Sequence, residues 1–166
     1  DFTTIANDPD TDPYNFTVGK GDGDVVTGME VINDQLVIFK RKRIAVSFSG
    51  ENTDNVTVEW APAGIGCTSR RGLAMYQGKA YFPAEDGFYT FDGSIVEKIS
   101  EQIQPTYEGI ADVTKIVGEC YNGKYYASYA VSGSTNKIYV LVYDIASKTW
   151  WKYKLANGIT DWVLWD

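Results

Sequence analysis

Short apolar runs with alternating polar positions, separated by tight-turn dipeptides, recur along most of the chain. Three segments share this pattern, at residues 28–50, 72–93 and 117–144. Each has a turn dipeptide after its first short run: Asn33-Asp34, Gln77-Gly78 and Asn122-Gly123. Asn-Gly and Asn-Asp pairs between apolar runs are typical of β-hairpins. The pattern therefore predicts a series of antiparallel hairpins.

The spacing of these turns gives the size of the repeating unit. Asn33, Gln77 and Asn122 lie 44 and 45 positions apart. Candidates for a fourth strand follow the third strand of each unit, in the sequences NVTVEWA, SIVEKIS and TWWKYKL. A period near 45 residues with four strands per unit is typical of β-propeller blades. The sequence thus predicts an all-β, propeller-like fold.

The predicted organisation is a leader followed by one repeat domain. Residues 1–24 form an acidic, Gly-rich leader in which YNFTVG is a candidate edge strand, and residues 25–166 hold the repeats. The units are expected at about 25–61, 68–100 and 110–155, with the start of a further unit at 156–166. A propeller needs about four blades to close. Three alternatives stay open: the termini close the ring, a partner completes an open array, or the chain is a fragment of a larger propeller.

The basic run Lys40–Arg43 stands out because the chain carries 15 Lys and Arg against 22 Asp and Glu, a net charge of −7. A shift of 44 positions aligns it with Ala84–Gly87, which has the composition of a hairpin turn. We therefore interpret the basic run as a solvated hairpin tip that lies near the acidic tip Glu85-Asp86. Direct nucleic-acid binding is not expected, because flanking aromatic residues and a wider cationic face are missing.

Few residues suggest catalytic or metal-binding chemistry. The chain has no histidine, which removes the commonest general base and the commonest zinc ligand. The acidic stretch Asp8–Pro13 departs from a calcium loop and is interpreted as a leader. For Gly21–Asp24, a Gly-rich turn is favoured over a cation site made by carboxylates and carbonyls. Cys67 and Cys120 match no zinc pattern and are expected to be buried thiols, with a single disulfide as the alternative. No catalytic residue, cofactor or metal is predicted, and a carboxylate pair acting as a hydrolase is disfavoured.

The connection after the first unit is rich in glycine. Pro62–Cys67 lacks the Lys-Ser/Thr ending of a phosphate-binding loop. We interpret it as the crossing between units, where small residues let the chain pass near the central axis. Arg70 and Arg71 follow it, and two roles stay open for them: lining a channel or forming a surface pair.

Tryptophan pairs occur towards the end of the chain, at Trp150-Trp151 and at Trp162 and Trp165. Exposed aromatic rings are common in sugar-binding sites, but outer strands of a propeller also use them to pack one blade on another. Blade packing is the favoured interpretation. The residues predicted to contribute to an interaction surface are Lys40, Arg41, Lys42, Arg43, Glu85, Asp86, Trp150 and Trp151.

The motifs in these units resemble virion proteins of tailed bacteriophages, a family of phage stabilisation and tail-hub proteins. The resemblance covers about residues 15–155 and rests on structural motifs. These are the Gly21–Asp24 lead-in, the T-G-h-x-h-h-N-D-x-L-h-h-F-K run from Thr27 to Lys40, the G-h-G-C element at Gly64–Cys67 and the D-G-h-Y-x-F-D-G element at Asp86–Gly93. Members of that family are usually several times longer than this chain.

The resemblance implies a non-enzymatic part of the phage neck or tail, such as a head–tail connector component. It would assemble in the bacterial cytoplasm and reside in the virion, binding other virion proteins and copies of itself in a homo-oligomer or ring. No membrane span is expected, since no apolar run approaches about 20 residues. The alternative is a glycan-binding propeller module that recognises host-surface carbohydrate through exposed Trp and Tyr.

Overall fold

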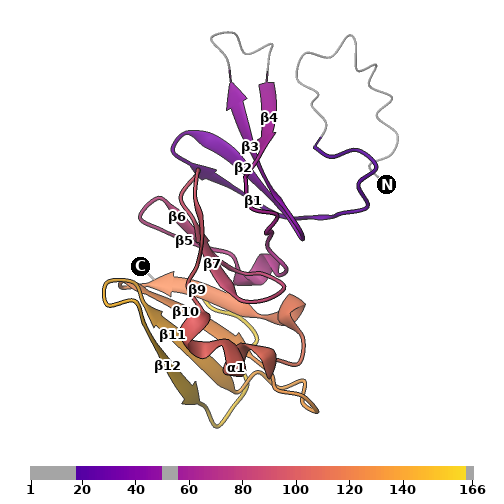
Figure 1. Cartoon of the computed structure of the whole chain (residues 1–166). Helices are drawn as coiled ribbons and strands as arrows, with labels where there is room; N and C mark the ends of the chain where they lie inside the picture. Colours follow the sequence, from indigo (N-terminus) through magenta and orange to yellow (C-terminus); the bar gives the residue numbers. More distant parts are fainter. Residues whose placement is uncertain (1–17, 50–55, 164–166) are drawn as a thin grey trace.

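Three four-stranded antiparallel sheets form the computed structural model, which describes residues 18–49 and 56–163 (Figure 1). The first sheet contains β1 (Val26–Ile32), β2 (Gln35–Lys40), β3 (Ile44–Ser49) and β4 (Val56–Trp60). The second contains β5 (Ala74–Tyr76), β6 (Lys79–Pro83), β7 (Phe88–Phe91) and β8 (Val96–Lys98). The third contains β9 (Val117–Tyr121), β10 (Lys124–Tyr129), β11 (Tyr139–Asp144) and β12 (Thr149–Lys154). Each sheet pairs its strands in chain order, so the predicted all-β, propeller-like fold is confirmed.

The first hairpin of every sheet turns at the predicted dipeptide. Both residues of each turn have positive φ: 50° and 62° at Asn33-Asp34, 48° and 73° at Gln77-Gly78, and 46° and 72° at Asn122-Gly123. A two-residue type I′ turn requires this left-handed conformation at both positions, because its twist matches that of the flanking strands. The turn dipeptides in the sequence therefore mark positions where the backbone needs residues that tolerate positive φ.

The second hairpin confirms the alignment of Lys40–Arg43 with Ala84–Gly87. In the first sheet the Lys40 backbone N–H donates to the Arg43 carbonyl at 2.8 Å. In the second sheet the Ala84 N–H donates to the Gly87 carbonyl, also at 2.8 Å. The basic run and the acidic turn therefore occupy the same place in consecutive units.

The second sheet lies between the other two, and its alternating residues serve two separate clusters (Figure 1). Ala80 and Phe82 of β6 face the first sheet, where they meet aliphatic residues such as Val37 and Ile44. Tyr81 and Phe88 point the other way, towards the third sheet. Since side chains alternate across a strand, one strand supplies two interfaces, and the predicted packing between units is confirmed.

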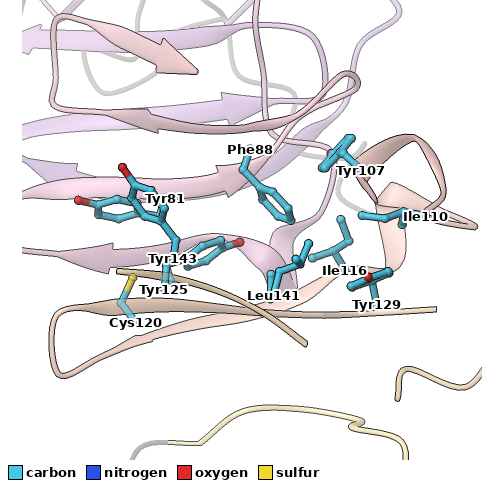
Figure 2. Close-up of a cluster of buried hydrophobic side chains, with 12 residues drawn as sticks. Tyr81, Phe88, Tyr107, Ile110, Ile116, Cys120, Tyr125, Tyr129, Leu141 and Tyr143 are labelled. Carbon is cyan, nitrogen blue, oxygen red and sulfur yellow. The ribbon is translucent and has the colours of Figure 1, made fainter. Parts of the chain in front are cut away.

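The cluster between the second and third sheets is dominated by tyrosine (Figure 2). The Tyr81 and Tyr125 rings stack with centroids 6.0 Å apart, and Phe88 meets Tyr125 edge-on at 5.8 Å. Tyr125 is fully buried, and its hydroxyl donates to the Gly72 carbonyl at 2.7 Å. Buried tyrosines need such acceptors, so this hydrogen bond also fixes the chain that enters the second sheet.

A short helical segment between the second and third sheets was not predicted. A 3-10 turn (Glu101–Ile103) leads into α1 (Gln104–Glu108), and a second 3-10 turn (Val113–Lys115) precedes β9. Tyr107 is buried against Phe88, and its hydroxyl donates to the Ala84 carbonyl at 2.5 Å. This helix therefore covers one end of the aromatic cluster.

The strands that were expected near the two ends of the chain are not found in the described residues. Most of the candidate edge strand YNFTVG lies outside the described residues, and Val18 and Gly19 belong to a bend and turn. A further unit was expected to begin at residues 156–166, of which the described residues 156–163 form no strand. Over the described residues the three sheets do not close into a ring.

Candidate functional site

The basic hairpin is held by the acidic segment that precedes β1. The Lys40 ammonium lies 2.6 Å from the Asp22 carboxylate, and Lys40 is only 2% exposed. Two residues on, the Asp24 carboxylate accepts the Lys42 backbone N–H at 3.0 Å. The hydrogen bond from Lys40 lowers the pKa of Asp22 below its usual value. The expectation of a fully solvated tip is therefore wrong for Lys40, because the strand turns its side chain onto the sheet.

The remaining residues of this tip stay on the surface. Arg41, Lys42 and Arg43 are exposed, and the Arg43 guanidinium lies 5.3 Å from the Trp60 ring centroid. The Lys40 ammonium approaches the same ring at 5.9 Å. Cations over an indole face are attracted by its quadrupole, so Trp60 anchors two members of the basic run.

The acidic tip is paired within its own sheet. Asp86 contacts the Lys98 ammonium at 3.0 Å and accepts the Tyr89 hydroxyl at 3.0 Å. Burial alone would raise the pKa of Asp86, but the hydrogen bonds from Lys98 and Tyr89 outweigh it and lower that pKa. Burial, reinforced by Asp86, raises the pKa of Tyr89 to about 12. Glu85 is exposed, and no ion pair in the described part of the chain joins the two tips.

Trp150 and Trp151 point to opposite faces of the third sheet. The Trp150 indole N–H donates to the Ile99 carbonyl at 2.7 Å, and its ring lies 4.9 Å from that of Tyr143. Trp150 is therefore half-buried and packs against the core. Trp151 pairs with Val142 across β11 and β12 and is 43% exposed. Of the two predicted surface tryptophans, the structure leaves only Trp151 available.

Trp151 forms part of an apolar groove of about 390 Å³ on the outer face of the third sheet. Two segments form it: strands β10 to β12, and the chain that folds back after β12. The Trp162 ring lies 5.5 Å from that of Tyr126, and its indole N–H has no hydrogen-bond partner among the described residues. The lining residues are Lys124, Tyr126, Val140, Val142, Trp151, Tyr153, Leu155 and Trp162.

The first sheet also has an outer face that no other sheet covers. Met29 and Val31 on β1 are 61% and 65% exposed, and Trp60 on β4 is 38% exposed. The register of β1 with β2 places Met29 opposite Ile38 and Val31 opposite Leu36. An apolar stripe therefore runs along this face. The alternation of apolar and polar residues in the sequence could have located this stripe. It could not have shown that no other sheet covers the stripe.

The connection Pro62–Cys67 crosses the tip of its own unit. A Cβ at Gly66 would collide with the backbone at Lys40 and Arg43, and the Cys67 N–H donates to the Lys40 carbonyl at 2.9 Å. Glycine is required by this close approach. Arg70 and Arg71 are both exposed. Arg71 forms an ion pair with Asp161 at 2.8 Å.

Metal and thiol chemistry receive little support from the described residues. Cys67 and Cys120 are buried and unbonded, as expected for free thiols. Burial raises the pKa of Cys67 to about 12 and that of Cys120 well above its ordinary value. In the described ranges, no group of three or more His, Cys, Asp or Glu could hold a metal ion. The acidic stretch Asp8–Pro13 lies outside those ranges.

Comparisons with known proteins add no relative. Neither the models of known protein families nor the curated proteins give a match for this chain. None of the described helices is long and apolar enough to cross a membrane.

Proposed function

We propose that this chain is a structural component of a tailed-phage neck or tail, which acts by protein–protein contact and performs no catalysis. The phage context rests on the sequence motifs described above. The mode of action rests on one structural observation: the two outer sheets each present an apolar face. On the first sheet this face includes Met29 and Val31, and on the third it includes Trp151 and Tyr153.

Exposed apolar faces of this kind favour assembly. Monomeric soluble proteins rarely leave a contiguous patch of large apolar side chains in water, and such patches usually mark contact with another macromolecule. Here the exposed residues are carried by sheets, whose rigid backbone is a suitable platform for a permanent contact. The charges of the chain fit the same role, because a net charge of −7 favours solubility before assembly and repels packaged DNA.

The partners are then other virion proteins and other copies of the chain, and the location is the particle itself. Antibodies against the chain, applied to tailed particles purified from the host that carries its gene, test the proposal. The expected result in electron micrographs is gold label at the neck or tail of intact particles. Label confined to the unassembled fraction, with particles free of the chain by mass spectrometry, would contradict it.

A second function, in a different class, is favoured by the groove on the third sheet. Four aromatic side chains line it, and aromatic rings stack on the apolar faces of sugars. In this alternative the chain is a module that binds host-surface glycan.

A glycan panel separates the two functions. The alternative expects a sugar to quench tryptophan fluorescence in the native chain and not in Trp151→Ala. Of the adjacent tryptophans Trp150 and Trp151, only Trp151 lines the groove, so Trp151 is the one to replace in this test. If no member of the panel changes the fluorescence of the native chain, the groove is not a glycan site.

A further inference from the structure

The second sheet has one face towards the first sheet and one towards the third. In β6, Ala80 and Phe82 face the first sheet, and Tyr81 between them faces the third. Their positions are three, five and four residues after the turn residue Gln77. The repeat allows the same positions to be located in the other two sheets.

No sheet covers the preceding face of the first sheet, whose edge strand β1 exposes Met29 and Val31 while Ile38 beside them is buried. The third and fifth residues after Asn33 are Leu36 and Ile38, which share a face with Met29 and Val31 through the β1–β2 register. In the second and third sheets the equivalent positions meet a neighbouring sheet. The uncovered stripe therefore occupies the place of a blade-to-blade interface.

No sheet covers the following face of the third sheet, where the chain after β12 folds back and places Trp162 on Tyr126. The fourth residue after Asn122 is Tyr126, which corresponds to Val37 and Tyr81 in the earlier units. Both of those residues are buried against the next sheet. Tyr126 instead lines the groove with Trp151.

The chain after β12 follows the route of a connection between units. The two internal connections each bond to the second hairpin of the unit they leave, through Cys67 to Lys40 and through Tyr107 to Ala84. After β12, the Ile159 N–H donates to the Lys137 carbonyl at 3.0 Å, in the corresponding hairpin. The chain after the third unit thus bonds to its own unit as the two internal connections do.

We propose that a second copy of this chain supplies that sheet, head to tail, so that two copies form a closed six-bladed propeller. The inference rests on the proposed function and names the partner of the two apolar faces. Propellers close with about four to eight blades, so three units fall short, two copies give six and three copies exceed the range. Each interface joins the following face of one copy to the preceding face of the other, and a ring of two contains both.

The two faces also match in kind. The interface between the first two sheets places Val37, Val46 and the ring of Phe39 against the aromatic residues Phe82 and Phe91. Across the proposed contact, the stripe with Val31 would meet the aromatic face with Trp151. Aliphatic and small side chains opposite large rings fill an interface without voids.

Light scattering after size exclusion, over a concentration series, tests the ring. The native chain, 18.5 kDa as a monomer, is expected to elute at about twice that mass. Val31→Glu and Trp151→Lys are each expected to shift it to the monomer, because each damages one face. Ile95→Glu is the matched control for Val31→Glu. Ile95 is 66% exposed and Val31 is 65% exposed, but Ile95 lies just before β8 and on neither apolar face. A cooperative thermal unfolding transition confirms that each variant folds, and the two monomeric variants are expected to unfold at a lower temperature than the native dimer.

Mixing the two variants distinguishes a head-to-tail contact from a symmetric one. A pair made of Val31→Glu and Trp151→Lys keeps one undamaged interface, so an equimolar mixture is expected to regain part of the dimer. If only one of the variants dissociates the dimer, or if the mixture stays monomeric, the head-to-tail ring is wrong. A monomeric native chain that still labels phage particles would overturn the ring and leave the proposed function standing.

Discussion

The ammonium of Lys40 lies 2.6 Å from the carboxylate of Asp22, and the lysine is almost completely buried against its own sheet. This ion pair joins two segments that look unrelated in the sequence, a Gly- and Asp-rich lead-in and a run of four basic residues. The lead-in partly neutralises the hairpin and fixes the chain at the start of β1.

The pair predicts a specific pattern of stability. Asp22→Asn should lower the midpoint of thermal unfolding, because it leaves the buried Lys40 ammonium without a counter-charge. Lys40→Met should cost less than Asp22→Asn, since it replaces the buried charge with an apolar chain of similar length. In a double-mutant cycle the two changes should cost less together than the sum of the single effects. Strictly additive effects would show that the contact does not couple the two segments.

Gly66 offers a test of the crossing between the first two units. Gly66→Ala should destabilise the fold by about 1–3 kcal/mol, because its Cβ would collide with the backbone of the Lys40–Arg43 hairpin. Gly64→Ala is the matched control, since open space surrounds that position. Urea unfolding measures both. Equal effects of the two substitutions would argue against the close crossing.

Adjacent tryptophans should behave in opposite ways. Trp150→Ala removes a ring packed on Tyr143 and Phe88 and should cost about 3 kcal/mol of unfolding free energy. Trp151→Ala removes an exposed ring and should change the stability of the monomer by about 0.5 kcal/mol or less. Chemical denaturation at a concentration that keeps the variants monomeric makes the comparison. A larger loss for Trp151 would mean that the two faces of β12 are assigned wrongly.

Alkaline pH should unfold the protein through its buried tyrosines and thiols. Burial raises the pKa of Tyr81 and of Tyr129 from 10.0 to about 12, and that of Cys67 from 9.0 to about 12. A raised folded-state pKa means that the folded state holds the proton more tightly, so this stabilisation is complete below pH 9. It is lost as the pH rises from about 9 to 12. Unfolding free energies measured in steps from pH 8 to pH 11 should fall steadily, and a flat profile would contradict the burial of these groups.

Local chemistry made much of the fold predictable. The type I′ turns at Asn33, Gln77 and Asn122 and the alternation of the strands around them set the period of the units. The equivalence of Lys40–Arg43 with Ala84–Gly87 followed from that period. These features depend on a few neighbouring residues, and the hydrogen bonds of both hairpins confirm them.

What the sequence did not reveal depends on distant contacts. Lys40 was assigned to a solvated tip because its burial depends on Asp22, 18 positions away. The groove beside Trp151 needs Trp162 to fold back over Tyr126, and no local pattern encodes that return. The short helix α1 was missed because its five residues are too few for a helical period.

Hydroxyl-radical footprinting read by mass spectrometry tests the central claim most directly, because it measures the side-chain exposure of both apolar faces at once. Met29, Trp151 and Tyr153 are exposed in the single chain and carry reactive side chains. Trp150 packed against the core and Ile95 in its exposed turn serve as internal references. As the protein concentration rises, we predict that Met29 on the first sheet and Trp151 and Tyr153 on the third become protected together while both references stay constant. Constant labelling of all three residues, or protection on one sheet alone, would contradict an assembly built from these two faces.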